Sequence, residues 1–194
     1  MGAGFATAEP IKIVAFGDSL MASYQIEPSL GFPAQLKKAL AAKGLEVEMT
    51  DAAVSGDTTS GGLERLDWSV PDGTQIAILE LGANDMLRGL PPEQAEANLD
   101  AMIGKLKARN IRVILAGMLA APNMGKAYED AFNSMFPRLA EKHKLPLIPF
   151  FMNGVAGVPG LQLEDRMHPN PKGVEIMVQN ALPVILQAVT EPSQ

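Results

Sequence analysis

The stretch IKIVAFGDSLMAS, residues 11–23, decides the fold. Its first six residues are almost continuously apolar, which is typical of a strand that is covered on both faces of a sheet. The run stops at Gly17, and an acid, Asp18, and a hydroxyl, Ser19, follow at once. Taken alone, Ser19 is either an ordinary cap of the next helix or a hydroxyl that is placed to react.

Four further apolar runs repeat the strand pattern, at residues 47–53, 75–81, 112–117 and 145–150. Helical patterns occupy residues 32–43, a segment opened by Pro91 and Pro92, the region 128–139 and residues 171–189. Strands that alternate with helices predict an α/β domain with a parallel sheet and helices on both faces. We expect one such domain over residues 11–190, preceded by a flexible N-terminal segment at residues 1–10.

The residues that follow these strands are the place to look for a site, because ligands bind beyond the carboxyl ends of the strands in doubly wound sheets. Small residues beside hydroxyl, amide or acid groups follow four of the five strands: Gly17-Asp18-Ser19, Ser55-Gly56-Asp57, Gly82-Ala83-Asn84-Asp85, and a loop with Asp165 and His168. Turns use the same residue types, so only their shared edge of the sheet indicates a site. We interpret Asp18, Asp57 and Asp85 as scaffold residues that accept hydrogen bonds from loop N–H groups.

A serine hydroxyl becomes a nucleophile when a neighbouring imidazole accepts its proton. Of the two histidines in the chain, His143 lies in a charged helix end and is expected on the solvated surface, whereas His168 shares the predicted edge with Ser19. Asp165, three residues before His168, can reach Nδ1 of the imidazole and fix its tautomer. The alternative for His168 is a structural histidine that caps a helix or packs in the core.

Acyl transfer also needs hydrogen-bond donors for the oxyanion that develops at the substrate carbonyl. Gly56 can offer a backbone N–H, Asn84 a side-chain amide, and Ser19 its own N–H at the head of a helix. The structural alternatives are a turn glycine at Gly56 and a helix cap at Asn84.

The composition excludes several classes of protein. Without cysteine, the chain has no disulfide, no thiol nucleophile and no thiolate metal site. The formal net charge of −6 argues against a nucleic-acid-binding surface, and no run approaches the roughly 18 apolar residues of a membrane span. Ala6-Thr7-Ala8 matches a signal-peptidase cleavage pattern, which predicts a periplasmic or secreted protein; the alternative location is the cytoplasm.

The motifs FGDSL, SGDT, LGAND and DRMHP resemble, in order and spacing, the four sequence blocks of the GDSL/SGNH hydrolases. The resemblance runs from about Ile11 to Ala188, and within the family the chain looks most like the bacterial periplasmic arylesterase, acyl-CoA thioesterase and lysophospholipase group. It implies a three-layer α/β/α sandwich with a five-stranded parallel sheet in the flavodoxin-like order 2-1-3-4-5. It implies no metal and no organic cofactor.

The same resemblance implies a role for each candidate residue. Ser19 matches the nucleophile, His168 the general base and acid, and Asp165 the carboxylate that orients the imidazole. Gly56 and Asn84 match the residues of the oxyanion hole, which the Ser19 N–H completes.

Two positions depart from the family pattern. Arg166 stands where close relatives often have glycine, which puts the path of the turn before His168 in question. Ser23 stands where many relatives have a glycine soon after the serine, and we expect it to narrow the mouth of the site.

Together these residues predict a serine esterase for small-molecule aryl or alkyl esters, with acyl thioesters and lysophospholipids as further substrates. The apolar loop after the fourth strand is the candidate acyl or aryl pocket, through Met118, Leu119, Ala121 and Pro122; a plain connecting loop is the alternative. A carbohydrate or acetyl esterase of the same family is the second hypothesis, disfavoured by the few aromatic residues. A non-catalytic flavodoxin-like module that binds phosphate or flavin is the third, and it lacks a phosphate cradle. The oligomeric state is left open.

Overall fold

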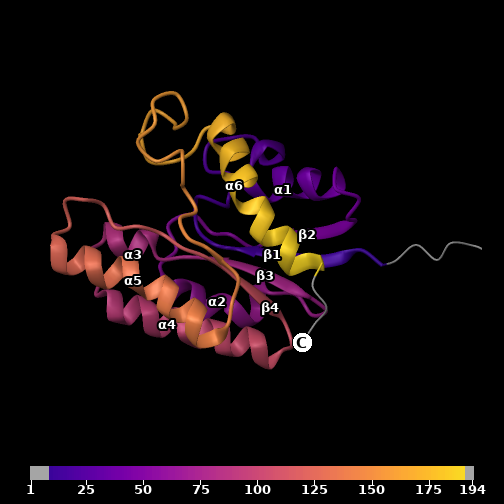
Figure 1. Ribbon diagram of the computed structural model, residues 1–194, viewed down its shortest axis with the longest axis horizontal. Helices are drawn as coiled ribbons and strands as arrows, with labels where there is room; N and C mark the ends of the chain where they lie inside the picture. The colour runs from indigo at the N-terminus through magenta and orange to yellow at the C-terminus, as the bar shows by residue number, and fades with distance from the viewer. Residues whose placement is uncertain (1–8, 191–194) are drawn as a thin grey trace, which may run out of the picture.

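The structure of the chain is a computed structural model that describes residues 9–190. The Ala6-Thr7-Ala8 pattern and all but two residues of the expected N-terminal segment lie outside the described residues. The described residues form a sheet between two layers of helices (Figure 1).

The sheet contains five parallel strands in the order β2-β1-β3-β4-β5. The strands are β1 Ile11–Phe16, β2 Val47–Asp51, β3 Ile76–Glu80, β4 Arg112–Ala116 and β5 Leu147–Ile148. The fold class and the strand order expected from the sequence are therefore confirmed. Every residue of β3 is buried, which explains its unbroken apolar sequence.

The last strand is much shorter than the predicted run of residues 145–150. Pro146 and Pro149 flank its two residues, and a proline has no N–H to donate to a neighbouring strand. Pairing with β4 is therefore limited to Leu147 and Ile148.

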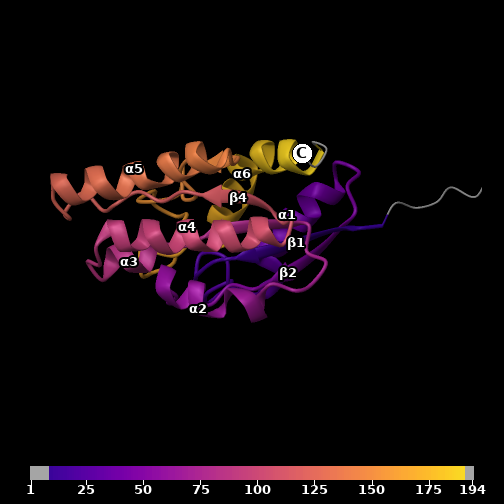
Figure 2. The ribbon, with the colours of Figure 1, turned by 90° about the horizontal axis from the view of Figure 1, so that it is seen from below.

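Helices cover both faces of the sheet (Figures 1 and 2). On one face α1, Phe32–Ala41, packs against α6, Pro171–Thr190; on the other lie α2, Thr59–Ser69, α4, Pro92–Ala108, and α5, Lys126–His143. Two short helices complete the fold, η1 at Pro28–Leu30 and α3 at Ala83–Leu87. Both α5 and α6 continue through an internal proline, Pro137 in α5 and Pro183 in α6.

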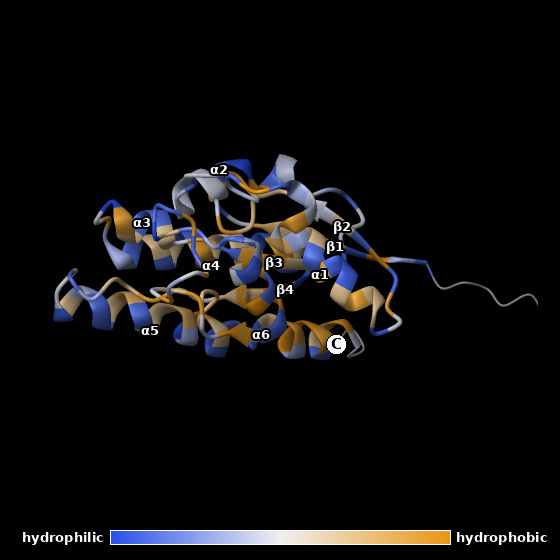
Figure 3. Ribbon diagram, turned by 90° about the horizontal axis from the view of Figure 1, so that it is seen from above, coloured by the Kyte–Doolittle hydropathy of each residue, from blue (hydrophilic) through white to orange (hydrophobic). Residues whose placement is uncertain are grey.

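Helix α6 is long and apolar enough, by length and composition alone, to cross a membrane. Its orange colour in Figure 3 reflects this composition. One face of α6, which includes Val174, Met177, Ala181 and Ile185, is buried in the core. This burial fits a helix that covers a sheet, and the absence of a membrane span remains a prediction.

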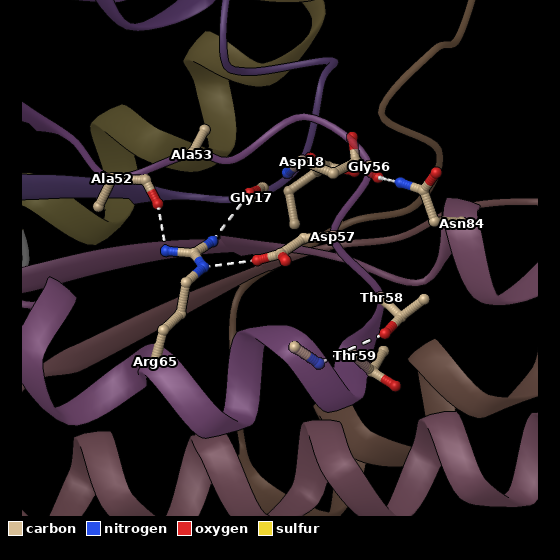
Figure 4. Close-up of polar contacts among 12 residues, drawn as sticks. Gly17, Asp18, Ala52, Ala53, Gly56, Asp57, Thr58, Thr59, Arg65 and Asn84 are labelled. Carbon is tan, nitrogen blue, oxygen red and sulfur yellow. Dashed lines mark hydrogen bonds and ion pairs between the residues drawn. The ribbon is translucent and has the colours of Figure 1, made fainter.

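Arg65 on α2 was not singled out in the sequence, yet it joins the ends of two strands (Figure 4). Its Nη2 donates to the Gly17 carbonyl after β1 (3.1 Å) and its Nη1 to the Ala52 carbonyl after β2 (2.6 Å). Its Nε donates to Asp57, and its Cζ lies 4.0 Å from the centroid of the Phe16 ring. With a side chain only 7% exposed, this guanidinium has a carboxylate, two carbonyls and an aromatic face as partners.

We predict that Arg65→Met lowers the free energy of unfolding by about 3–5 kcal/mol, because it leaves the Asp57 carboxylate and two loop carbonyls without their partner. Urea unfolding at neutral pH measures the change. Arg138→Met is the matched control: Arg138 pairs with Glu96 on the surface, its side chain is 52% exposed, and such pairs contribute about 1 kcal/mol or less. Equal losses in the two variants would contradict a special role for Arg65.

Candidate active site

Ser19, His168 and Asp165 form a continuous chain of hydrogen bonds. The Oγ of Ser19 lies 2.9 Å from Nε2 of His168, 149 residues away in the sequence. The Nδ1 of the same ring lies 2.6 Å from Oδ2 of Asp165. The fold thus brings the turn after β1 and the loop before α6 together, as the shared edge of the sheet predicted.

The turn that carries Ser19 differs from the expectation of a helix. Residues 19–25 form turns, and α1 begins only at Phe32, so Ser19 neither caps nor opens a helix. Ser23 and Gln25 explain the difference, because their φ angles of 55° and 54° are left-handed and cannot continue a right-handed helix. Ser23 does not line the pocket described below, contrary to our expectation that it narrows the mouth of the site. Its hydroxyl packs instead against Gly31, where a Cβ would collide with Ser23 Oγ.

The turn that carries His168 is built around the Asp165 carboxylate. Oδ1 of Asp165 accepts from the backbone N–H groups of Met167 (2.9 Å) and His168 (3.0 Å), and Oδ2 faces the imidazole. Burial alone would raise the pKa of Asp165, but hydrogen bonds from the His168 ring and from both N–H groups lower it to about 2. The carboxylate is therefore ionised throughout the neutral range. Arg166 adopts the left-handed φ of 57° here, the conformation that glycine would favour.

Three hydrogen-bond donors line the same pocket as Ser19 Oγ. Within residues 9–190, the backbone N–H groups of Ser19 and Gly56 have no acceptor. Asn84 donates from Nδ2 to Oδ2 of Asp18 (2.9 Å, Figure 4), which occupies one of its two amide hydrogens. Gly56 has a φ of 85°, which accounts for a glycine at this turn. Asn84 lies inside α3, where Gly82 is the N-cap, so it is not a helix cap.

The other acids that follow the strands act as scaffold residues. Asp85 is buried and accepts from the backbone N–H (2.8 Å) and the hydroxyl (2.6 Å) of Thr59, which ties α3 to the start of α2. Asp57 accepts from the Arg65 guanidinium, a side chain where we had expected loop N–H groups.

An apolar pocket of about 880 Å³ opens beside Ser19. The four loop residues predicted to line it, Met118, Leu119, Ala121 and Pro122, all do so. Further apolar lining comes from other segments: Met86, Leu87, Phe150, Met152 and Ala156. The loop after β4 is therefore part of the pocket wall and more than a plain connection.

Tyr24 is a pocket residue that the sequence analysis missed. Its ring lies against the His168 imidazole, with the two centroids 4.2 Å apart and the planes tilted by 33°. An aromatic residue five positions after the serine was the available signal, but nothing in the sequence showed which way its ring points.

His143 is not the solvated histidine that we expected. Its Nε2 lies 2.6 Å from Oδ1 of Asp100 on α4, and its side chain is only 16% exposed. Among residues 9–190, no group of three or more His, Asp or Glu side chains is arranged to hold a metal ion.

Comparison with known proteins identifies relatives over most of the chain. The model of the GDSL-like lipase/acylhydrolase family matches residues 15–176. An arylesterase of Vibrio mimicus is 39% identical over 165 residues, which cover 83% of this chain and 81% of that protein. Thioesterase 1/protease 1/lysophospholipase L1 of Escherichia coli K12 is 35% identical over 86% of this chain and 79% of its own length. The crystal structure of TesA superposes with a TM-score of 0.85 at 35% identity, covering 90% of this chain and 97% of that one.

We predict that Arg166→Gly raises the free energy of unfolding by about 0.5–1 kcal/mol, because glycine adopts a left-handed φ without the strain that a Cβ causes. Arg166→Ala is the matched control, since alanine removes the same long side chain and keeps the Cβ. Urea unfolding of the two variants and the wild type measures the difference. If the Gly and Ala variants are equally stable, this turn stores no backbone strain.

Proposed function

Because the chain belongs to the GDSL-like lipase/acylhydrolase family, a family of ester-bond hydrolases, we propose that it is a serine esterase that works through an acyl-enzyme. The observation that carries this proposal is the hydrogen-bonded chain from Ser19 through His168 to Asp165, at the mouth of an apolar pocket. The reaction that we propose for Ser19, His168 and Asp165 needs no cofactor.

Acylation begins at Ser19. Its Oγ attacks the carbonyl carbon of the ester while its proton passes to Nε2 of His168, 2.9 Å away. Asp165 holds the proton on Nδ1 and stabilises the imidazolium that forms, which its low pKa of about 2 permits at neutral pH.

Hydrogen-bond donors without an acceptor would stabilise the negative charge that develops on the carbonyl oxygen of the substrate. These are the backbone N–H groups of Ser19 and Gly56 and the remaining amide hydrogen of Asn84. Each donor of this kind contributes about 10²–10³ in rate.

Collapse of the tetrahedral intermediate releases the alcohol or thiol, which takes the proton from His168 Nε2. Water then gives a proton to the same nitrogen and attacks the acyl carbonyl, and Ser19 leaves with that proton restored.

The pocket favours an apolar acyl or aryl group. Its volume of about 880 Å³ is near the upper end of ordinary small-molecule sites, and most of its lining is aliphatic or methionine. We therefore propose aryl and alkyl esters as substrates, with acyl thioesters and lysophospholipids as further candidates, supported by what the two named relatives act on. Sugar esters fit less well, because Trp68, the single tryptophan, is 78% exposed and does not line the pocket.

We also propose a periplasmic or secreted location. The support is the small-residue pattern Ala6-Thr7-Ala8, which lies outside the described residues.

Ser19→Ala should lower kcat for p-nitrophenyl butyrate by about 10⁴-fold or more, because no other oxygen replaces the nucleophile. Ser29→Ala, at an exposed serine of η1 that lies outside the pocket, is the control and should keep wild-type turnover. A serine-directed organophosphate should modify Ser19 of the wild type covalently, with one group per protein molecule. Peptide mass spectrometry locates the modified residue. Near-native turnover of the Ser19→Ala variant would refute the proposed nucleophile.

A chain-length series of p-nitrophenyl esters tests the pocket. We expect kcat/KM to rise about fourfold for each added CH₂ up to the end of the pocket, since burial of one CH₂ contributes about 0.8 kcal/mol. Ala121→Phe fills part of the wall and should remove this rise for octanoate while acetate hydrolysis stays near wild type. Equal effects on both esters would show that the acyl chain does not bind against Ala121.

A further inference from the structure

Two carboxyl groups that the mechanism above does not use lie side by side in the core beneath the site. Asp18, after β1, and Glu80, the last residue of the neighbouring strand β3, are both fully buried. The Asp18 N–H donates to Oε2 of Glu80 (3.2 Å), and Oε1 of Glu80 has no hydrogen-bond partner in the described part of the chain. Two adjacent charges without solvent repel strongly, so the pair must retain one proton.

The contacts of Asp18 show which partner carries that proton. Its Oδ1 accepts from the Leu20 N–H (3.0 Å) and its Oδ2 accepts from the Asn84 amide (2.9 Å). Both oxygens thus face donors, as suits an ionised carboxylate. Glu80 accepts one hydrogen bond at Oε2 and has a spare oxygen, which suits a neutral acid.

The electrostatics agree with this assignment. Burial raises the pKa of Asp18 to about 6, against the opposing effect of hydrogen bonds from Leu20 and Asn84 and the charge of His168. Burial and the neighbouring charge of Asp18 raise the pKa of Glu80 well above its usual value. Both effects favour a charge on Asp18 and a proton on Glu80.

The surrounding residues hold the side chains of Asp18 and Glu80 close together and away from solvent. A Cβ on Gly17 would lie 2.6 Å from Oε2 of Glu80, so a glycine is needed there to let the two strands bring the acids together. Arg65 donates to the Gly17 carbonyl and to the Asp57 carboxylate, so its charge is shared with partners other than the two acids.

We propose that Glu80 is a positioning residue: as a neutral acid it donates to the Asp18 carboxylate, and Asp18 in turn fixes the Asn84 amide so that its free hydrogen points at the substrate oxyanion. The inference rests on the proposed function, because Asn84 is taken to stabilise the oxyanion. It extends the oxyanion hole inward by two buried residues.

Glu80→Gln and Glu80→Met separate this role from simple packing. Glutamine imitates the protonated acid, since its carbonyl accepts from the Asp18 N–H and its amide donates to the Asp18 carboxylate. Methionine has similar length and remains buried, but it offers neither contact. We expect kcat of the Gln variant to stay within about threefold of wild type, and kcat of the Met variant to fall by about tenfold or more while KM changes little.

The protonation of Glu80 has a readout that does not depend on turnover. At pH 8 the infrared spectrum of the wild type should contain the C=O band of a buried protonated carboxylic acid, and Glu80→Gln should lack it. Thermal unfolding and circular dichroism of both variants check that the fold is retained.

Three results would overturn the inference: no such band in the wild type, wild-type kcat in a folded Glu80→Met variant, or a Gln variant as slow as the Met variant. A failure of the proposed function is recognised separately, because Ser19→Ala would then keep its turnover while the infrared band still reports the state of Glu80.

Discussion

The guanidinium of Arg65 fixes the distance between two of the loops that form the site. Gly17 and Ala52 directly follow β1 and β2, and the carbonyls of both residues accept from this one side chain. Ser19 lies two residues beyond the first carbonyl, and Gly56 directly precedes Asp57, the third partner of Arg65. A buried charge is costly to desolvate, and here four partners offset that cost. The Ser19 hydroxyl and the Gly56 N–H are therefore held in place by a residue of the helix layer below the sheet.

Three acids that follow the strands connect their loops to other elements in the same way. Asp57 binds α2 through Arg65, Asp85 binds α2 through Thr59, and Asp18 binds α3 through Asn84. In three of the motifs that follow strands, a residue that lines the pocket, Ser19, Gly56 or Asn84, thus stands beside an acid that joins its loop to another element. This structural role explains why Asp18 and Asp85 are buried.

The sequence predicted the parts of the fold that depend on local pattern. Apolar runs located all five strands, and the shared edge of a parallel sheet brought Ser19 near His168. Helix α2 was missed because Gly61 and Gly62 are poor helix formers and its buried face includes a charged residue, Arg65. The stacking of Tyr24 and the pairing of His143 were missed for another reason: they depend on side-chain directions across elements, which no spacing along the chain encodes.

The two turns around the imidazole contain most of the left-handed non-glycine residues in the described part of the chain. Of the five non-glycine residues with a positive φ among those described, three flank this site: Ser23, Gln25 and Arg166. Ser23 and Gln25 stand on either side of Tyr24, and Arg166 lies between Asp165 and His168. Such strain persists only where surrounding contacts impose it, and here those contacts restrain the ring from two directions. Asp165 binds Nδ1 of the imidazole, while the Tyr24 ring lies against the imidazole ring. With rotation blocked in this way, Nε2 has one direction left to point, and that direction is towards Ser19 Oγ.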